Sequence, residues 1–142
     1  MSYTYAYPRP AVTVDIAIFR KHEILLIRRK NEPFKNAWAL PGGFVDENEP
    51  LHTAAHRELL EETSLSGIEL AQFKTYGNPG RDPRGHTVSV VYYGYADENA
   101  NPIAADDALL LEWHSMYEIP EMAFDHGTIL TELFNRFFEL PY

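Results

Sequence analysis

Alternating apolar and polar residues run through much of the chain and predict β-strands. In residues 11–19 one face would carry the apolar residues Val12, Val14, Ile16 and Ile18. The other face would carry Thr13, Asp15 and Ala17. This period of two is typical of a strand with a single buried face, so we expect Asp15 to be solvated. Similar segments predict strands at 23–29, 38–40, 68–76, 87–96 and 109–115.

Turn-forming residues between these segments indicate how the strands connect. The turn at 20–22 predicts a hairpin between the first two strands, and the loop at 77–86 predicts a longer hairpin between the strands at 68–76 and 87–96. Pro41, Gly42 and Gly43 interrupt the short strand at 38–40. Two consecutive glycines would let the backbone approach a ligand closely.

Two segments have helical periodicity. The first starts near Pro50, with Asn48 or Glu49 as its N-cap. The second is capped by Asp125 and carries an apolar stripe of Ile129, Leu130, Leu133, Phe134, Phe137 and Phe138. His126 is expected to have a structural role at the start of this helix. The order of strands and helices predicts an α+β fold, a sandwich of helices around a mixed sheet.

Composition narrows the class of protein. A length of 142 residues is that of a single domain, taken as 1–142. The formal net charge of −9 disfavours general binding to nucleic acid or anionic membranes. The chain has no cysteine, which excludes disulfides and thiol chemistry. With no apolar segment of membrane-spanning length and no signal-peptide pattern, we expect a cytoplasmic protein.

The first predicted helix carries three acids on one face. Glu58, Glu61 and Glu62 are spaced i, i+3 and i+4, so their like charges repel. A hard divalent cation such as Mg²⁺ or Mn²⁺ would remove that repulsion, because such ions prefer carboxylate oxygens. Arg57 lies four residues before Glu61 and can orient its carboxylate.

Two simpler interpretations of this helix compete with a carboxylate metal site. The acids could form a solvated face, but Leu51, Ala55 and Leu59 lie next to them on the helical wheel, which places the acids at the edge of the buried side. His52 and His56 have a spacing that can bind zinc, yet no third ligand or base accompanies them and they lie away from the glutamates.

The spacing of these residues resembles the Nudix box, G-x5-E-x7-R-E-U-x-E-E-x-G-U, where U is a large aliphatic residue. The matching positions are Gly43, Glu49, Arg57, Glu58, Leu59, Glu61, Glu62 and Leu65. Ser64 replaces the glycine that ends the helix, which costs turn freedom but removes no ligand. The resemblance implies an α/β/α sandwich. It also implies a Mg²⁺-dependent enzyme that hydrolyses a nucleoside diphosphate linked to another moiety.

The same resemblance implies roles for individual residues. Glu58 and Glu62 would hold the metal ion, with Glu61 as a third ligand or as the base. The carbonyl of Gly42 would add a ligand, and Glu49 and Arg57 would support the acids. Nudix enzymes commonly use another acid from outside the box. The candidates are Asp106, Asp107 and Glu112, and the sequence does not choose among them.

The loop at 77–86 suggests the substrate. Arg81 and Arg84 could offset phosphate charge, and Asp82 could bind a ribose hydroxyl, although a solvated turn is the simpler interpretation. Residues 31–49 and 80–94 resemble the ADP-ribose pyrophosphatases within the Nudix group. ADP-ribose is therefore the expected substrate, with AMP and ribose 5-phosphate as products.

Several alternatives remain open at this level. The substrate could be a sugar nucleotide or an oxidised nucleoside triphosphate, or the chain could be a module that senses a metabolite without turnover. The intact set of box acids favours catalysis. Homodimers are common among the resembling pyrophosphatases, and the aromatic segment with Tyr3, Tyr5 and Tyr7 is a candidate contact.

Overall fold

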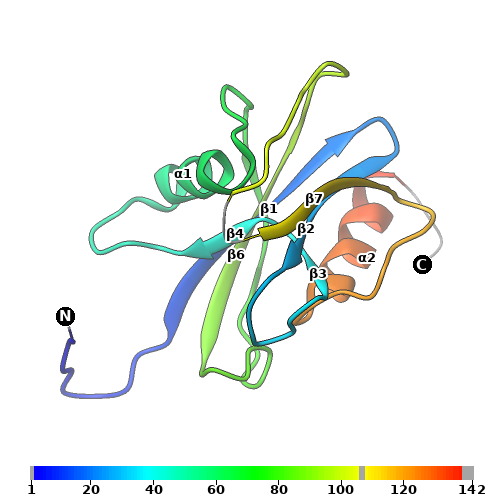
Figure 1. The fold of residues 1–142 in the computed structure, drawn as a ribbon. Coiled ribbons are helices and arrows are strands. Elements are labelled where there is room, and N and C mark those ends of the chain that lie inside the picture. Colours follow the sequence, from blue (N-terminus) through cyan, green and yellow to red (C-terminus); the bar gives the residue numbers. More distant parts are fainter. Residues whose placement is uncertain (1, 106–107, 139–142) are drawn as a thin grey trace.

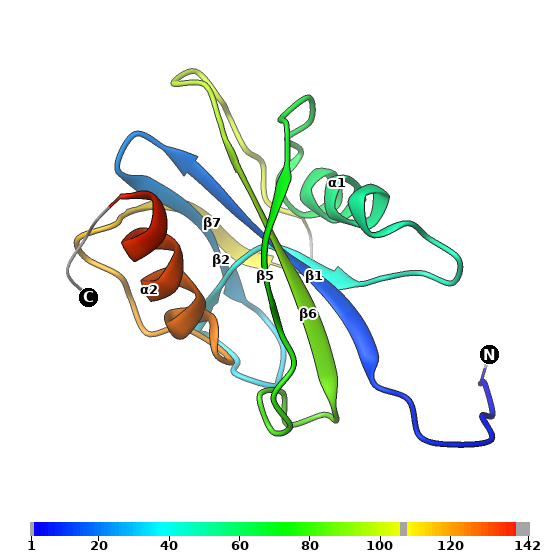
Figure 2. The same ribbon diagram turned by 180° about the vertical axis from the view of Figure 1, so that it is seen from behind.

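A mixed β-sheet with one helix on each side forms the centre of the protein (Figures 1 and 2). The structure is a computed structural model that describes residues 2–105 and 108–138. The strand order is β3-β2-β1-β6-β5, and β4 pairs with β1 while β7 pairs with β2. The pair β1 and β6 is parallel, and the other pairs are antiparallel. The predicted α+β sandwich is confirmed.

The strands lie close to their predicted positions. Their bounds are β1 Ala11–Arg20, β2 Glu23–Arg29, β3 Trp38–Ala39, β4 Gly42–Phe44, β5 Ala71–Tyr76, β6 Thr87–Tyr95 and β7 Ala108–Ser115. Both predicted hairpins are present, β1 with β2 and β5 with β6. The segment from Gly42 to Phe44 differs, because the sequence predicted a break there and the structure shows a strand paired with Thr13 to Asp15.

Strand β1 is buried on both faces, which corrects the expectation of a half-exposed strand. Val14, Ile16 and Ile18 pack with residues of helix α1 (Leu51–Thr63). Ala17 and Phe19 pack with residues of helix α2 (His126–Phe137) on the opposite face. Asp15 shares the face of Ala17 and is only 7% exposed, so the prediction that it is solvated was wrong.

The ends of helix α1 differ in part from the predicted caps. Pro50 occupies the N-cap position with an extended backbone, and no side chain of Asn48 or Glu49 caps the helix. Ser64 adopts the left-handed conformation, with φ of 63°, and its N–H donates to the carbonyl of Leu60 at 2.9 Å. A serine thus occupies a conformation that glycine adopts more easily, as the sequence predicted.

Helix α2 begins at His126, as expected, but without the predicted cap. The Asp125 side chain makes no capping hydrogen bond and instead pairs with Arg81. The apolar stripe is confirmed, because Ile129, Leu130, Leu133 and Phe134 are buried against the sheet. Neither helix in the described part of the chain has the length and apolar character needed to cross a membrane.

Candidate active site

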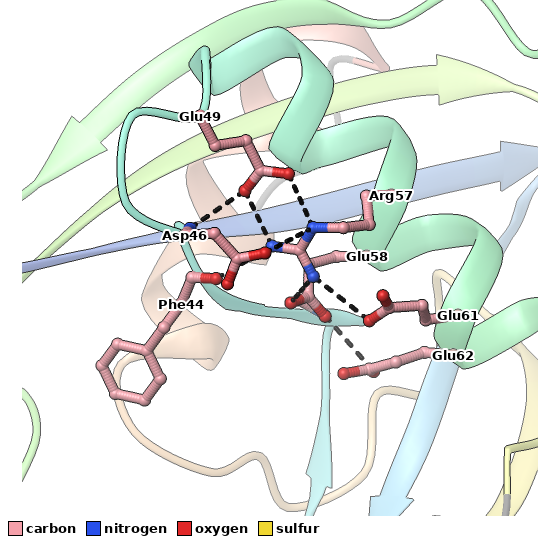
Figure 3. A network of polar contacts seen from close by, with 8 residues as sticks. Phe44, Asp46, Glu49, Arg57, Glu58, Glu61 and Glu62 are labelled. Atoms are coloured by element: carbon pink, nitrogen blue, oxygen red, sulfur yellow. Dashed lines mark hydrogen bonds and ion pairs between the residues drawn. The ribbon is translucent and has the colours of Figure 1, made fainter. Parts of the chain in front are cut away.

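The guanidinium of Arg57 holds together the acids of helix α1 and the turn before it (Figure 3). Its Nε and Nη2 donate to the two carboxylate oxygens of Glu49 at 2.7 and 2.9 Å. Its Nη1 donates to Glu58 at 2.9 Å and to Glu61 at 3.2 Å. Nη2 also donates to the carbonyl of Phe44 at 3.0 Å, which ties the helix to strand β4. One arginine therefore orients three motif acids, whereas the spacing predicted only its contact with Glu61.

Glu49 stabilises the turn that leads into helix α1. Its Oε1 accepts the N–H of Asp46 at 3.0 Å in addition to the bond from Arg57. These bonds, from Arg57 first and the Asp46 backbone second, lower the pKa of Glu49 to about 2. The predicted supporting role of Glu49 agrees with this geometry.

Glu58 is the buried acid of the group, with 8% of its surface exposed. Burial raises the pKa of its carboxyl group, and the bond from Arg57 offsets part of that effect. The carboxylate lies directly against Gly43, where an added Cβ would come within 2.5 Å of Oε1. Any larger residue at position 43 would therefore require the Glu58 carboxylate to shift.

Glu61 and Glu62 complete the acidic face. Glu61 is exposed and is directed to Arg57, whereas Glu62 accepts the N–H of Gly42 at 3.4 Å. Within the described residues, no three His, Asp or Glu side chains are close enough together to hold a metal ion. The donor set nevertheless fits a hard divalent cation in residue type and in its shared helix face.

A pocket opens beside these acids and gathers residues from distant parts of the chain. Glu62 of helix α1 lines one side of the pocket, next to Gly42 and Gly43 of strand β4. The other lining residues are Thr13, Asp15, Ile27, Arg29, Ala39, Leu40, Phe44, Arg81, Asp82, Arg84, Phe124 and His126. The predicted metal-site and substrate-binding segments therefore meet in one pocket.

The loop between β5 and β6 supplies two arginines to this pocket, both in ion pairs. Arg81 has a side chain only 5% exposed and binds both oxygens of Asp125, at 2.6 and 2.9 Å. Arg84 donates from Nε and Nη2 to Asp82 at 3.1 and 2.8 Å. These bonds lower the pKa of Asp82. The loop therefore forms part of the pocket wall and is not the solvated turn that the sequence also allowed.

Three further residues line the pocket without having been predicted to belong to the site. They are Arg29, Phe44 and Phe124. Arg29 lies at the end of β2, where a strand-end cation is usually a surface residue, and its side chain contacts the ring of Phe124 with 4.9 Å between Cζ and the ring centroid. The guanidinium of Arg84 lies 5.2 Å from the Phe44 ring and 5.6 Å from the Phe124 ring. Arginine and aromatic rings in one wall form a surface suited to a planar base.

The floor of the pocket carries a buried polar cluster centred on Asp15. Its Oδ2 accepts a hydrogen bond from the Ser89 hydroxyl and lies 3.6 Å from Nε2 of His126. The Leu40 N–H donates to Nδ1 of His126 at 3.0 Å. Burial acts to raise the pKa of Asp15, but His126, Ser89 and Arg81 outweigh it and the pKa is lowered. The structural role predicted for His126 agrees with its bond to the backbone.

The remaining candidates lie elsewhere. Glu112 on β7 pairs with Leu26 of β2, is exposed, and contacts His114 at 3.4 Å instead of lining the pocket. Asp106 and Asp107 lie outside the described residues. The Nε2 atoms of His52 and His56 are 3.2 Å apart on the outer face of α1.

Comparisons with known proteins agree with this arrangement. The model of the family described as "NUDIX domain" matches residues 9–133. An ADP-ribose pyrophosphatase from Methanocaldococcus jannaschii is 42% identical over 127 residues, which cover 89% of this chain and 74% of the relative. The ADPR responsive transcriptional repressor NtrR of Acinetobacter baylyi is 41% identical, and the match covers 92% of this chain but 55% of that protein.

Solved structures show the same fold. The NUDIX domain of Shewanella oneidensis NrtR, solved in complex with ADP ribose, superposes with a TM-score of 0.85 at 32% identity. That match covers 92% of this chain and 90% of the solved chain. A MutT/nudix family protein from Enterococcus faecalis gives a TM-score of 0.84 at 32% identity, over 95% of this chain and 64% of the other.

Proposed function

The chain belongs to the Nudix family, and from that premise we propose that it is a pyrophosphatase that hydrolyses ADP-ribose. Water adds across the diphosphate: its oxygen bonds to one phosphorus while the bond from that phosphorus to the bridging oxygen breaks. The products are AMP and ribose 5-phosphate. The domain proposed to carry this activity spans residues 1–142.

One observation carries the proposal. Glu62 lines a pocket whose other wall holds Arg29, Arg81 and Arg84, and the Glu58 carboxylate lies against Gly43 of the same pocket. Carboxylates for a metal ion and guanidinium groups for phosphate thus face the same space. The similarity to an ADP-ribose pyrophosphatase and to a domain solved with ADP ribose supports this choice of substrate.

The residues proposed to hold the metal ion are Glu58, Glu61, Glu62 and the carbonyl of Gly42. We propose Mg²⁺, with Mn²⁺ as the substitute, because both are hard ions that prefer oxygen ligands. Such an ion, when bound, polarises the diphosphate and lowers the pKa of water. Glu61 and Glu58 remain the candidates for the base that takes the proton of the attacking water.

Arg57 and Glu49 would act by positioning. Arg57 holds Glu58 and Glu61 by one nitrogen and Glu49 by two others, so the acids keep fixed positions while the reaction proceeds. The Phe44 carbonyl, bound to the same guanidinium, fixes strand β4 beside the helix. Supporting residues of this kind typically contribute about 10–100-fold to metal affinity or activity.

The loop between β5 and β6 would bind substrate. A guanidinium has five N–H donors, so Arg81 and Arg84 keep donors for phosphate oxygens while paired with Asp125 and Asp82. Asp82 is held by Arg84 and by the Arg84 backbone N–H at 2.9 Å, so a ribose hydroxyl would share its oxygens with those donors. Phe44 and Phe124 would stack on the base.

The proposal extends to assembly and location. We propose a homodimer, supported by an exposed aromatic segment in which Tyr3, Tyr5 and Tyr7 are 55%, 51% and 64% exposed. Arg9 lies over the Tyr5 ring at 4.2 Å and orders part of this segment. Light scattering on the chain with and without residues 2–8 tests this contact. We also propose a cytoplasmic location, where nucleotide substrates and Mg²⁺ are abundant.

The deciding experiment is turnover of a nucleotide panel with Mg²⁺, led by ADP-ribose and including a sugar nucleotide and an oxidised nucleoside triphosphate. Formation of AMP and ribose 5-phosphate that stops when EDTA is added is the expected result. Turnover of another panel member alone would reject ADP-ribose as the substrate. Tight binding of ADP-ribose without any turnover would reject the enzymatic function and indicate a sensing module.

A further inference from the structure

A buried carboxylate forms part of the pocket floor without belonging to the motif acids. Asp15 is 7% exposed and lies in the middle of β1, away from both ends of the strand. Burying an ionised carboxylate costs free energy unless it is paired and hydrogen-bonded. An apolar residue would fill this position in a strand that is otherwise packed on both faces. The acid therefore requires an explanation beyond packing.

The internal partners of Asp15 all approach the same carboxylate oxygen. Oδ2 accepts the Ser89 hydroxyl and faces Nε2 of His126 at 3.6 Å. Because the Leu40 N–H donates to Nδ1 of His126, that nitrogen carries no proton, and the proton of the neutral ring is on Nε2, toward Asp15. Ser89 and His126 thus fix the rotamer of Asp15 and leave its other oxygen on the opposite side.

That second oxygen lies where strand β4 passes closest to β1. Oδ1 accepts no hydrogen bond from any residue that the structure describes, and both Asp15 and Gly42 line the pocket. A Cβ at Gly42 would come within 2.6 Å of Oδ1. The glycine therefore leaves this oxygen uncovered, and the pocket contains an acceptor with a fixed position and a negative charge.

The charges around the pocket determine what this acceptor can bind. Arg29, Arg81 and Arg84 place guanidinium N–H donors in one part of the wall, where Arg81 and Arg84 are paired with Asp125 and Asp82, whereas Asp15 makes the floor anionic. A phosphate placed against Asp15 would be repelled, so phosphates belong at the arginines. The floor suits a neutral N–H or O–H donor, either the amino group of a base or a ribose hydroxyl.

We propose that Oδ1 of Asp15 accepts a hydrogen bond from an amino or hydroxyl group of the bound nucleotide and thereby selects the ligand. Ser89 and His126 act as positioning residues for this carboxylate. The inference deepens the proposed function and rests on it for the class of ligand. A buried polar site of this kind discriminates strongly against a ligand that lacks the donor, because the acceptor is then left unpaired.

The test is binding of product-like ligands, which needs no turnover. Dissociation constants are measured by calorimetry with Mg²⁺ for three pairs: AMP with purine riboside 5′-monophosphate, AMP with 2′-deoxy-AMP, and ribose 5-phosphate with 2-deoxyribose 5-phosphate. The first pair removes the amino group, and the others each remove a hydroxyl. Asp15→Asn is compared with the unaltered chain and with Asp97→Asn. The control removes the same charge from an exposed residue in the loop after β6.

The unaltered chain and Asp97→Asn should bind the complete member of one pair about tenfold or more tightly than its analogue. Asp15→Asn should lose this preference, because Ser89 and Nε2–H of His126 hold the amide oxygen at the Oδ2 position and leave the NH2 donor in place of Oδ1. The pair affected identifies the source of the hydrogen bond. Discrimination retained in Asp15→Asn, or absent from the unaltered chain in all three pairs, would overturn the inference.

A crystal structure of the unaltered chain with the best-bound ligand keeps the inference testable if Asp15→Asn fails to fold. A ligand nitrogen or oxygen within about 3.2 Å of Oδ1 supports it, and a ligand without such a contact overturns it. This outcome is separate from that of the turnover panel. Discrimination without turnover of ADP-ribose would reject only the enzymatic function, and turnover with unchanged binding by Asp15→Asn would reject only the role of Asp15.

Discussion

Arg57→Met removes the hydrogen bonds that hold the acids of helix α1 while it keeps an apolar stem of similar length. The buried carboxylate of Glu58 then loses the donor that lies 2.9 Å from it. A buried acceptor left without a charged partner costs about 1–3 kcal/mol, and the repulsion between Glu58 and Glu61 adds a few tenths. The exposed pair with Glu61 contributes about 0–1 kcal/mol and changes the total little.

For a chain of this size, about 2 kcal/mol lowers the midpoint of thermal unfolding by roughly 8 °C. Turnover should fall about 10–100-fold, because the acids lose their fixed positions. Unfolding followed by circular dichroism and turnover of ADP-ribose with Mg²⁺ measure the two effects. Lys35→Met is the matched control, because it removes one positive charge from an exposed side chain and should change stability by less than about 0.5 kcal/mol.

Two results would refute this reasoning. If Arg57→Met unfolds within about 2 °C of the unaltered chain, Glu58 does not depend on the guanidinium for its stability. If the midpoint falls but turnover does not, Arg57 supports the fold without positioning the acids for reaction.

Four further substitutions test other parts of the site. Glu61→Gln and Glu62→Gln should each lower turnover by orders of magnitude with little change in unfolding temperature, and full turnover in both would end the argument for a carboxylate metal site. Gly43→Ala should lower kcat, because its Cβ would come within 2.5 Å of Glu58 Oε1, and an unchanged kcat would show that this carboxylate can move freely. Arg81→Lys should raise KM for ADP-ribose and destabilise the fold by about 1–3 kcal/mol, because lysine cannot form the two-pronged bond that the buried Arg81 makes to Asp125; equal KM and unfolding temperature would reject this role.

The acidic face of α1 could be predicted from the sequence because it depends on local spacing. Glu58, Glu61 and Glu62 share a face because they are spaced i, i+3 and i+4, and Glu61 lies four residues after Arg57, where the structure places it within bonding distance of the guanidinium. The bond from Arg57 to Glu58, its neighbour in sequence, does not follow from this spacing. Glu49 could be assigned a supporting role only through the family pattern. Its approach to Arg57 depends on the turn before the helix, which periodicity does not describe.

The errors concern side chains whose partners are distant in sequence. Asp15 has the pattern of a solvated strand residue, but α2 packs on that face of β1 and buries it. Asp125 has the pattern of a cap, but Arg81, 44 residues away, takes both of its oxygens. Arg29 had no predicted role, and its contact with Phe124 depends on the turn before α2. Local sequence contains none of this information, because tertiary packing selects the partner.

The pair Gly42 and Gly43 shows how a glycine pattern can serve the protein itself. In a strand, consecutive Cβ positions point to opposite sides. A Cβ at Gly42 would meet Asp15 Oδ1 at 2.6 Å and the Val14 carbonyl at 2.2 Å, and a Cβ at Gly43 would meet Glu58 Oε1 at 2.5 Å. Strand β4 therefore passes between two buried carboxylates, one from β1 and one from α1. Side chains at these two positions would displace both acids. The glycines therefore set the separation between Asp15 on the pocket floor and Glu58 on helix α1.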